Sequence, residues 1–162
     1  MARRCFFSFH YERDIWRANQ VRNSWVTQDR EAAGFWDASL WEESKKEGDE
    51  AIRRLIDEGL KGTSVTAVLI GAETANRKYV KYEIEKSYER RNGLVGVYIH
   101  KLKDQDGYTD SKGRNPFDDF YIERNGRRVC LSEIYRVYDW VSNDGYRNFG
   151  TWVEAAAKAA GR

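Results

Sequence analysis

The sequence predicts an α/β fold in which helices cover a parallel β-sheet. Two short segments, 65–70 (VTAVLI) and 94–99 (LVGVYI), are almost continuously apolar, and such runs are typical of strands that are buried on both faces. Segments with the apolar periodicity of helices alternate with them along the chain, which is the order expected for a parallel sheet wrapped by helices. A chain of 162 residues is long enough for one domain with a hydrophobic core.

In the first part of the chain we expect two strands and two helices. Residues 4–10 are rich in phenylalanine and predict a first strand, which we place beside the strand at 65–70. An apolar stripe at helical spacing predicts a helix over 14–25. Residues 34–41 (GFWDASLW) are expected to form a short second strand or an extended segment before a loop. Residues 49–61 show a clean apolar face and predict a second helix.

The second part of the chain contains one long polar segment. Residues 101–128 hold the only proline, three glycines and many charges, so we expect a long surface excursion with a hairpin turn at Asn125 and Gly126. Residues 129–140 are expected to form a short edge strand or a turn of helix. A last helix is predicted over 145–160, whose end is rich in alanine.

Composition excludes several classes of partner. The chain carries 28 basic and 26 acidic residues with a net charge of +2, and this near balance gives no electrostatic reason to bind nucleic acid. No run approaches the length of a transmembrane helix, and the apolar patch near the N-terminus is too short for a signal peptide. The two cysteines, Cys5 and Cys130, suggest unbridged thiols in a reducing compartment. We therefore expect a soluble, cytoplasmic protein without nucleic-acid or membrane partners.

One carboxylate lies next to the place where open α/β sheets bind ligands. Residues 71–77 follow the strand at 65–70, at its carboxyl end. The next helix is predicted to begin near Asn76, a good N-cap residue. Glu83 is one position, or about 100° of helical rotation, from the apolar stripe of this helix, and it is aligned with Tyr79 one turn earlier. Glu83 can therefore face a crevice at this edge of the sheet.

Other catalytic classes lack their motifs. A receiver domain needs an aspartate at the end of the third strand, where residues 71–73 are Gly, Ala and Glu. There is no G-x-G-x-x-G, P-loop or G-x-S-x-G motif, and the two histidines and two cysteines do not have the spacing of a metal site. Glu83 remains as the candidate. The alternative is an ordinary solvated helix glutamate, paired with Lys81 or Lys86.

Five segments, in chain order, resemble the TIR-like subunit of the bacterial Thoeris anti-phage system. They are FFSFHYxxD at 6–14, DASLWEESKK at 37–46, VTAVLIG at 65–71, NRKYVKYEI at 76–84 and SEIYRVYDWVSNDGY at 132–146. The resemblance spans nearly the whole chain. It implies a flavodoxin-like (TIR-like) α/β fold, a parallel sheet flanked by helices, in a single domain over residues 1–162 with the loop excursion at about 101–128.

The resemblance also implies an activity. Members cleave NAD at the bond between nicotinamide and ribose and form a cyclic ADP-ribose-type messenger, a diffusible nucleotide that activates a separate effector. NAD is then the substrate, and no cofactor or metal is expected. A phage-derived trigger and a homo-oligomer are further expected partners. The catalytic glutamate of the family falls on Glu83, whose carboxylate can stabilise the oxocarbenium charge that develops on the ribose. Tyr79 stands where many members have Trp.

The substrate-binding residues are expected around Glu83. Cyclisation requires water to be excluded, and we expect the segment 37–48 to form a lid. Three aromatic residues are expected to stack on nicotinamide or adenine, and three polar residues to contact the substrate at the rim: Phe9, Trp41 and Tyr79, and Ser8, His10 and Ser39. Alternatively, His10 is satisfied by backbone groups, Ser8 only shapes the turn, and Trp41 only packs. The alternative function is a catalytically silent TIR-like interaction or phage-sensing module.

Overall fold

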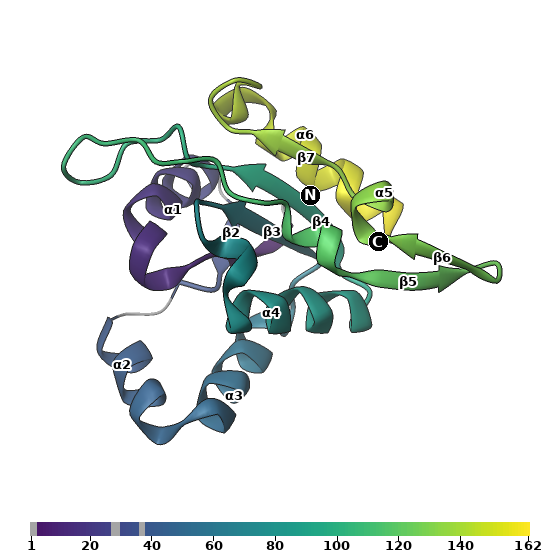
Figure 1. Ribbon diagram of the computed structural model, residues 1–162, viewed down its shortest axis with the longest axis horizontal. Coiled ribbons are helices and arrows are strands. Elements are labelled where there is room, and N and C mark those ends of the chain that lie inside the picture. Colours follow the sequence, from purple (N-terminus) through teal and green to yellow (C-terminus); the bar gives the residue numbers. More distant parts are fainter. Residues whose placement is uncertain (1–2, 27–29, 36–37) are drawn as a thin grey trace.

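The computed structural model describes residues 3–26, 30–35 and 38–162, with the side chains of residues 38–40 left out. Within this part of the chain, five parallel strands form the main sheet in the order β2-β1-β3-β4-β7 (Figure 1). Counted along the sheet strands alone, this is the 2-1-3-4-5 order of flavodoxin-like folds, so the predicted fold class is confirmed. The strands are β1 (Arg4–Ser8), β2 (Glu31–Ala33), β3 (Val65–Ile70), β4 (Gly93–Tyr98) and β7 (Val137–Asp139).

β3 lies at the centre of the sheet, as its continuous apolar sequence predicts. All six of its residues are buried, because β1 pairs with one edge and β4 with the other while helices cover both faces. The register places Phe6 beside Thr66, and Thr66 beside Leu94. The predicted position of the first strand, next to the central one, is also confirmed.

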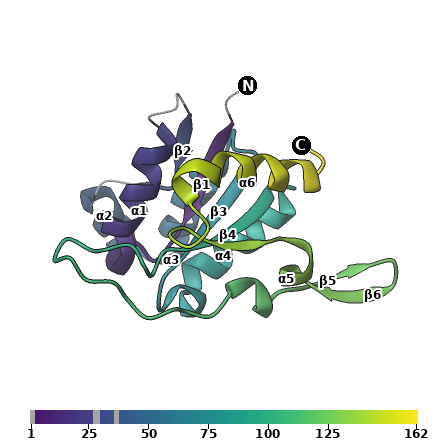
Figure 2. The same cartoon turned by 90° about the horizontal axis from the view of Figure 1, so that it is seen from above.

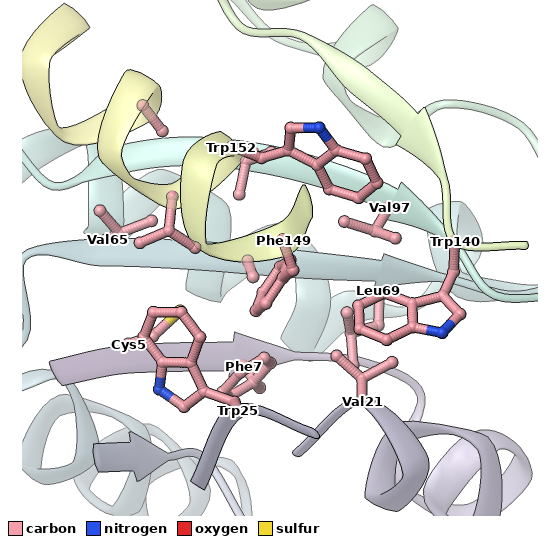
Figure 3. Close-up of a cluster of buried hydrophobic side chains, with 14 of the residues drawn as sticks. Cys5, Phe7, Val21, Trp25, Val65, Leu69, Val97, Trp140, Phe149 and Trp152 are labelled. Carbon is pink, nitrogen blue, oxygen red and sulfur yellow. The ribbon is translucent and has the colours of Figure 1, made fainter. Parts of the chain in front are cut away.

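Helices cover both faces of the sheet, and the side chains that pack against the two faces differ in kind. One face packs against α1 (Tyr11–Val26) and α6 (Gly145–Ala159) through an aromatic core, in which Phe7, Trp25 and Phe149 contact one another (Figure 3). The opposite face packs against α3 (Asp49–Leu60) and α4 (Lys78–Glu89) through mainly aliphatic side chains. α2 (Ala38–Glu47) packs beside α3 at the margin of this second layer (Figure 1).

Three local predictions need correction. The second strand occupies 31–33 and not 34–41. Gly34 has a φ of 90°, and a Cβ there would lie 2.3 Å from the backbone oxygen of Phe7, so the strand ends at this close approach and the chain continues into α2. The first helix begins at Tyr11, three residues earlier than predicted. Asn76 does not cap α4: it ends a 3-10 turn, η1 (Thr74–Asn76), before the helix starts at Lys78.

The segment 101–128 divides into two parts that extend on opposite sides of the molecule (Figure 2). Residues 99–115 form a long loop after β4. A short 3-10 helix, η2 (Pro116–Asp119), then places Phe117 in the core, where it is fully buried. The hairpin β5 (Tyr121–Arg124) and β6 (Arg127–Cys130) follows, with Asn125 and Gly126 both at positive φ in its turn, as the Asn-Gly pair predicts. The short helix α5 (Leu131–Ile134) leads to the edge strand β7.

Candidate functional site

A cavity lies at the carboxyl ends of β1 and β2, between the start of α1 and the helices α2 and α4. It encloses about 390 Å³ of empty space, part of it open to solvent. Residues 9–12, at the junction of β1 and α1, form one wall, Trp41 and Tyr79 form another, and Glu83 lines the cavity from the second turn of α4. The cavity therefore brings Glu83 together with aromatic side chains at the edge of the sheet where open α/β folds bind ligands.

Glu83 is buried in this cavity, where its polar partner is the hydroxyl of Ser8. Its side chain is 4% exposed, and the hydroxyl of Ser8 donates a hydrogen bond of 2.8 Å to Oε1. No basic side chain among the described residues forms an ion pair with it; Lys86 instead pairs with Glu89 at 3.1 Å. Burial raises the pKa of Glu83 to about 8, and the Ser8 hydrogen bond opposes part of that shift. The alternative of a solvated glutamate paired with a nearby lysine is therefore wrong.

The partnership of Ser8 and Glu83 follows from strand alternation. Phe6 and Ser8 are two residues apart in β1 and so point to the same face of the sheet, which is the face that α3 and α4 cover. Glu83 lies on the buried face of α4 with Val80 and Ile84. Ser8 is completely buried, so it does not lie at the rim where a direct substrate contact was expected. Its hydroxyl holds the carboxyl group of Glu83.

Aromatic rings form a continuous arc along the cavity. The ring centroids of Phe9 and Tyr11 are 5.9 Å apart, those of Tyr11 and Trp41 are 4.9 Å apart, and those of Trp41 and Tyr79 are 6.2 Å apart. Three of these four residues were predicted, and all four line the cavity. The hydroxyl of Tyr79 donates a hydrogen bond to Asp49, and burial together with this carboxylate raises the pKa of Tyr79 to about 12. The ring of Tyr79 is thereby anchored while one part of it faces the cavity.

His10 has a structural partner of its own. Its Nδ1 accepts a hydrogen bond of 3.4 Å from the backbone N–H of Arg13, and its backbone oxygen accepts one of 2.9 Å from the N–H of Asp14. His10 thus caps the N-terminus of α1, in agreement with the alternative that backbone groups satisfy it. Burial, and then the nearby Arg77, lower the pKa of His10, so the imidazole that lines the cavity is neutral at pH 7.

Ser39 is an expected substrate contact, and residues 37–48 are the expected lid. The side chain of Ser39 lies outside the described residues. The segment 37–48, from residue 38 onward, is the helix α2 and not a loop. This helix supplies Trp41, which is 6% exposed and packed against Tyr11 and Tyr79. In this structure Trp41 is part of the cavity wall.

Six residues that line the cavity were not named as site residues, and the turn after β3 was given too large a part. Tyr11 and Arg77 both line the cavity, but neither stands out in a local pattern. Of the turn 71–77, only Arg77 reaches it. Gly71 and Ala72 instead approach the loop 99–115, since a Cβ on Gly113 would lie 2.1 Å from the backbone oxygen of Gly71 and 3.0 Å from that of Ala72. Tyr11 and Arg77 both lie within segments that carry the family resemblance, which was the available signal.

Two further observations describe what this part of the chain holds. Within residues 3–26, 30–35 and 38–162, no three His, Cys, Asp or Glu side chains are grouped as metal ligands would be. Over the same residues, no helix combines the length and the apolar character needed to cross a membrane. Cys5 and Cys130 are both free thiols, as predicted.

Comparison with known proteins gives two matches. The family described as "Thoeris protein ThsB, TIR-like domain" matches residues 6–104, a range that includes both Ser8 and Glu83. A protein of Bacillus cereus (strain MSX-D12), provisionally named cyclic ADP-D-ribose synthase ThsB1, is 44% identical over 94% of this chain and 100% of its own length. The chain therefore belongs to the TIR-like domain family of the Thoeris protein ThsB.

Proposed function

We propose that this chain is an anti-phage signalling enzyme that cleaves NAD at the nicotinamide-ribose bond and forms a cyclic ADP-ribose-type messenger. The observation that carries the proposal is the buried carboxyl group of Glu83 in a cavity walled by aromatic rings. The name of the Bacillus cereus relative, a cyclic ADP-D-ribose synthase, supports the same reaction. NAD is consumed as substrate, and the proposal includes no resident cofactor.

The proposed chemistry begins with the charge of the substrate. The pKa of about 8 keeps Glu83 largely protonated in the free protein at neutral pH. The nicotinamide ring of NAD is a cation, and a positive charge beside a buried carboxyl group lowers its pKa. Substrate binding would thus produce the carboxylate where it is needed. The aromatic arc offers flat surfaces for the nicotinamide ring. The ring of Tyr79 belongs to α4, the helix of Glu83, and the ring of Trp41 packs against it.

Bond cleavage then follows from electrostatics. The C1′–N bond breaks, nicotinamide leaves with the electron pair as a neutral molecule, and the ribose becomes oxocarbenium-like. The Glu83 carboxylate stabilises this charge, and Ser8 holds the carboxylate in place. A nucleophile at the adenosine end of the same molecule attacks C1′ and loses a proton, which closes the ring. The packed aromatic side chains of the cavity wall limit the access of water, which would give the linear product instead.

The function is tested by analysing small molecules from phage-infected cells by mass spectrometry. Cells would express the wild-type chain, Glu83→Gln, or Glu85→Gln. Glu85 is the matched control, because it lies on the same helix but is exposed. We expect a cyclic ADP-ribose-type product with the wild type and Glu85→Gln and none with Glu83→Gln. Infected cells in which defence operates without such a product would favour the interaction module instead.

The partners extend the same proposal. A diffusible cyclic nucleotide requires a protein that binds it, so we propose that the messenger activates a separate effector protein. A phage-derived trigger, self-association and a cytoplasmic location belong to this proposal as well. Adding an extract from infected cells that express the wild-type chain to cells that carry only the candidate effector would test the messenger step, with extract from the Glu83→Gln cells as the control.

A further inference from the structure

Arg77 places a positive charge on the wall of the cavity. It precedes the first residue of α4 in an extended conformation, with φ −85° and ψ 124°, and its side chain is half-buried. Its charge contributes to lowering the pKa of both His10 and Glu12, two residues on the opposite wall. The guanidinium group therefore lies across the cavity from the start of α1. Among the described residues that line the cavity, Arg77 is the single Lys or Arg.

Neighbouring basic residues are already committed to carboxylates. Arg13 pairs with Asp110 at 3.0 Å and Glu73 at 3.2 Å, and the ammonium group of Lys45 binds Glu12. Lys78, the next residue along the chain, pairs with Asp49 at 2.6 Å. In contrast, no carboxylate within the described ranges lies within ion-pair distance of Arg77. Arg13 thus neutralises Glu73, and Lys45 neutralises Glu12, the acidic residue that lines the same cavity as Arg77 and Glu83.

We propose that Arg77 is a substrate-binding residue that holds the diphosphate group of NAD at the mouth of the cavity. This inference rests on the proposed function and deepens it. In the proposed function the nicotinamide ribose lies beside Glu83, so the diphosphate that follows it lies further along the same cavity, part of which is open to solvent. A guanidinium group presents paired N–H donors that match phosphate oxygens. Arg77 precedes Glu83 by six residues, or roughly 9 Å along the helix axis, which lets one helix contact both the ribose and the phosphates.

Such a contact would hold NAD in the orientation that places its nicotinamide-ribose bond beside Glu83. NAD carries its positive charge on nicotinamide and its negative charges on the diphosphate. Glu83 attracts the first and Arg77 attracts the second, so the two residues together define which end of the molecule enters the cavity. An aromatic arc alone cannot distinguish nicotinamide from adenine, because it offers a stacking surface to either ring. Arg77 would therefore determine the orientation of the substrate as well as its affinity.

The test combines variants of the protein with shortened substrates. Binding of NAD, nicotinamide mononucleotide and nicotinamide riboside would be measured by NMR titration of the ¹⁵N-labelled full chain carrying Glu83→Gln, so that nothing is cleaved. These ligands carry two, one and no phosphate groups. We expect Arg77→Ala to weaken NAD binding by about 10- to 100-fold, the usual effect of losing a hydrogen bond to a charged group, and to leave the binding of nicotinamide riboside unchanged. Arg77→Lys, which keeps the charge but loses the paired donors, should fall between.

Control variants separate the outcomes. Lys81→Ala removes a positive charge from an exposed position one turn along α4 and should change none of the affinities. Arg77→Met keeps the apolar stem of the side chain and replaces Arg77→Ala if the alanine variant does not fold. An equal loss for NAD and nicotinamide riboside, or no loss for either, would overturn the role of Arg77 while the cavity still binds nicotinamide. If NAD does not bind even with Arg77 in place, the proposed function itself fails, and the role of Arg77 with it.

Discussion

Two carboxyl groups are buried at the same edge of the sheet, and they differ first in the charge of their partners. Asp14 of α1 is completely buried, and burial raises its pKa to about 6. The guanidinium group of Arg17 lies 3.3 Å from it. Glu83 is equally inaccessible, and its pKa is raised further, to about 8. Within the described part of the chain no cation pairs with Glu83, whose partner is the neutral hydroxyl of Ser8.

The two groups also face different surroundings. Asp14 is pressed against the backbone, since a Cβ on Gly71 would lie 2.2 Å from its Oδ2. Its partner Arg17 donates hydrogen bonds of 2.8 Å to the backbone oxygens of Leu102 and Tyr108, so this pair fastens the loop 99–115 to α1. Glu83 opens onto the cavity. The comparison teaches that a buried carboxyl group with a counter-charge supports the structure, whereas one without a counter-charge but with a cavity is available for chemistry.

The largest expected difference between the two is in activity. Glu83→Gln should reduce NAD cleavage by about 10²- to 10⁴-fold, the usual contribution of a positioned acid or base, because an amide cannot supply the negative charge. Asp14→Asn should change the rate per folded molecule by less than threefold or so, because Asp14 does not line the cavity. Release of nicotinamide, measured by liquid chromatography and corrected for the folded fraction, checks both. Similar losses from both variants would erase the distinction.

The next largest effect is on stability, and it has the opposite pattern. Asp14→Asn leaves the buried Arg17 without its nearest carboxylate, which should lower the free energy of unfolding by on the order of 3 kcal/mol. Glu83→Gln should not lower it at pH 8, because the amide can still accept the hydrogen bond from Ser8 and carries no charge to bury. Urea denaturation followed by circular dichroism measures both. An Asp14→Asn variant as stable as the wild type would show that the other carboxylates near Arg17 replace it.

A pH series sharpens the comparison. The pKa of Glu83 is higher in the folded protein, about 8, than the ordinary value of 4.5. Raising the pH through this window ionises the unfolded chain first, so the folded state loses stability, by up to roughly 1.4 kcal/mol per pH unit. The wild type should therefore lose stability relative to Glu83→Gln as the pH rises from about 5 to 8. Unfolding midpoints at pH 5, 6.5 and 8 measure this, and a constant difference would contradict it.

The smallest effect concerns the hydroxyl that distinguishes the site of Glu83. Ser8→Ala should slow NAD cleavage by about tenfold, the cost of losing one hydrogen bond to a charged group. Because the Ser8 hydrogen bond lowers the pKa of Glu83, its loss should also move the acidic limb of the pH-rate profile to higher pH. Thr66→Val removes another buried hydroxyl, bonded to Ser87, and should leave the profile in place. Identical profiles for Ser8→Ala and the wild type would assign Ser8 to packing alone.

The sequence predicts the sheet well, for a physical reason. Strands that are buried on both faces must be almost continuously apolar, and β3 and β4 show this directly. The helical stripe of α4 likewise predicts that Glu83 lies at the margin of a buried face. The boundary between β2 and α2 was missed because it depends on the positive φ of Gly34 and its close approach to Phe7, which are properties of the folded backbone.

The candidate site was predictable only in part. The aromatic residues and Glu83 emerged from composition, helical spacing and family resemblance. Tyr11 and Arg77 were expected at the same edge of the sheet but were not named as site residues, because which side chains enter the cavity depends on how the start of α1 meets the start of α4. Ser8 was expected at the surface, since nothing in its own segment reveals that α4 covers the end of β1. Local patterns identify elements, but a cavity depends on how the elements meet.

The aromatic arc has a consequence for how this protein is made. Its rings at Tyr11, Trp41 and Tyr79 come from three helices that belong to successive parts of the chain. Contacts between distant segments form late, because the chain must lose the entropy of closing a long loop before such contacts stabilise it. The arc and the pocket beside Glu83 therefore assemble only after α4 has left the ribosome and docked on β1. Chains that end before α4 lack both Glu83 and Tyr79, so the site cannot form until this helix has been synthesised.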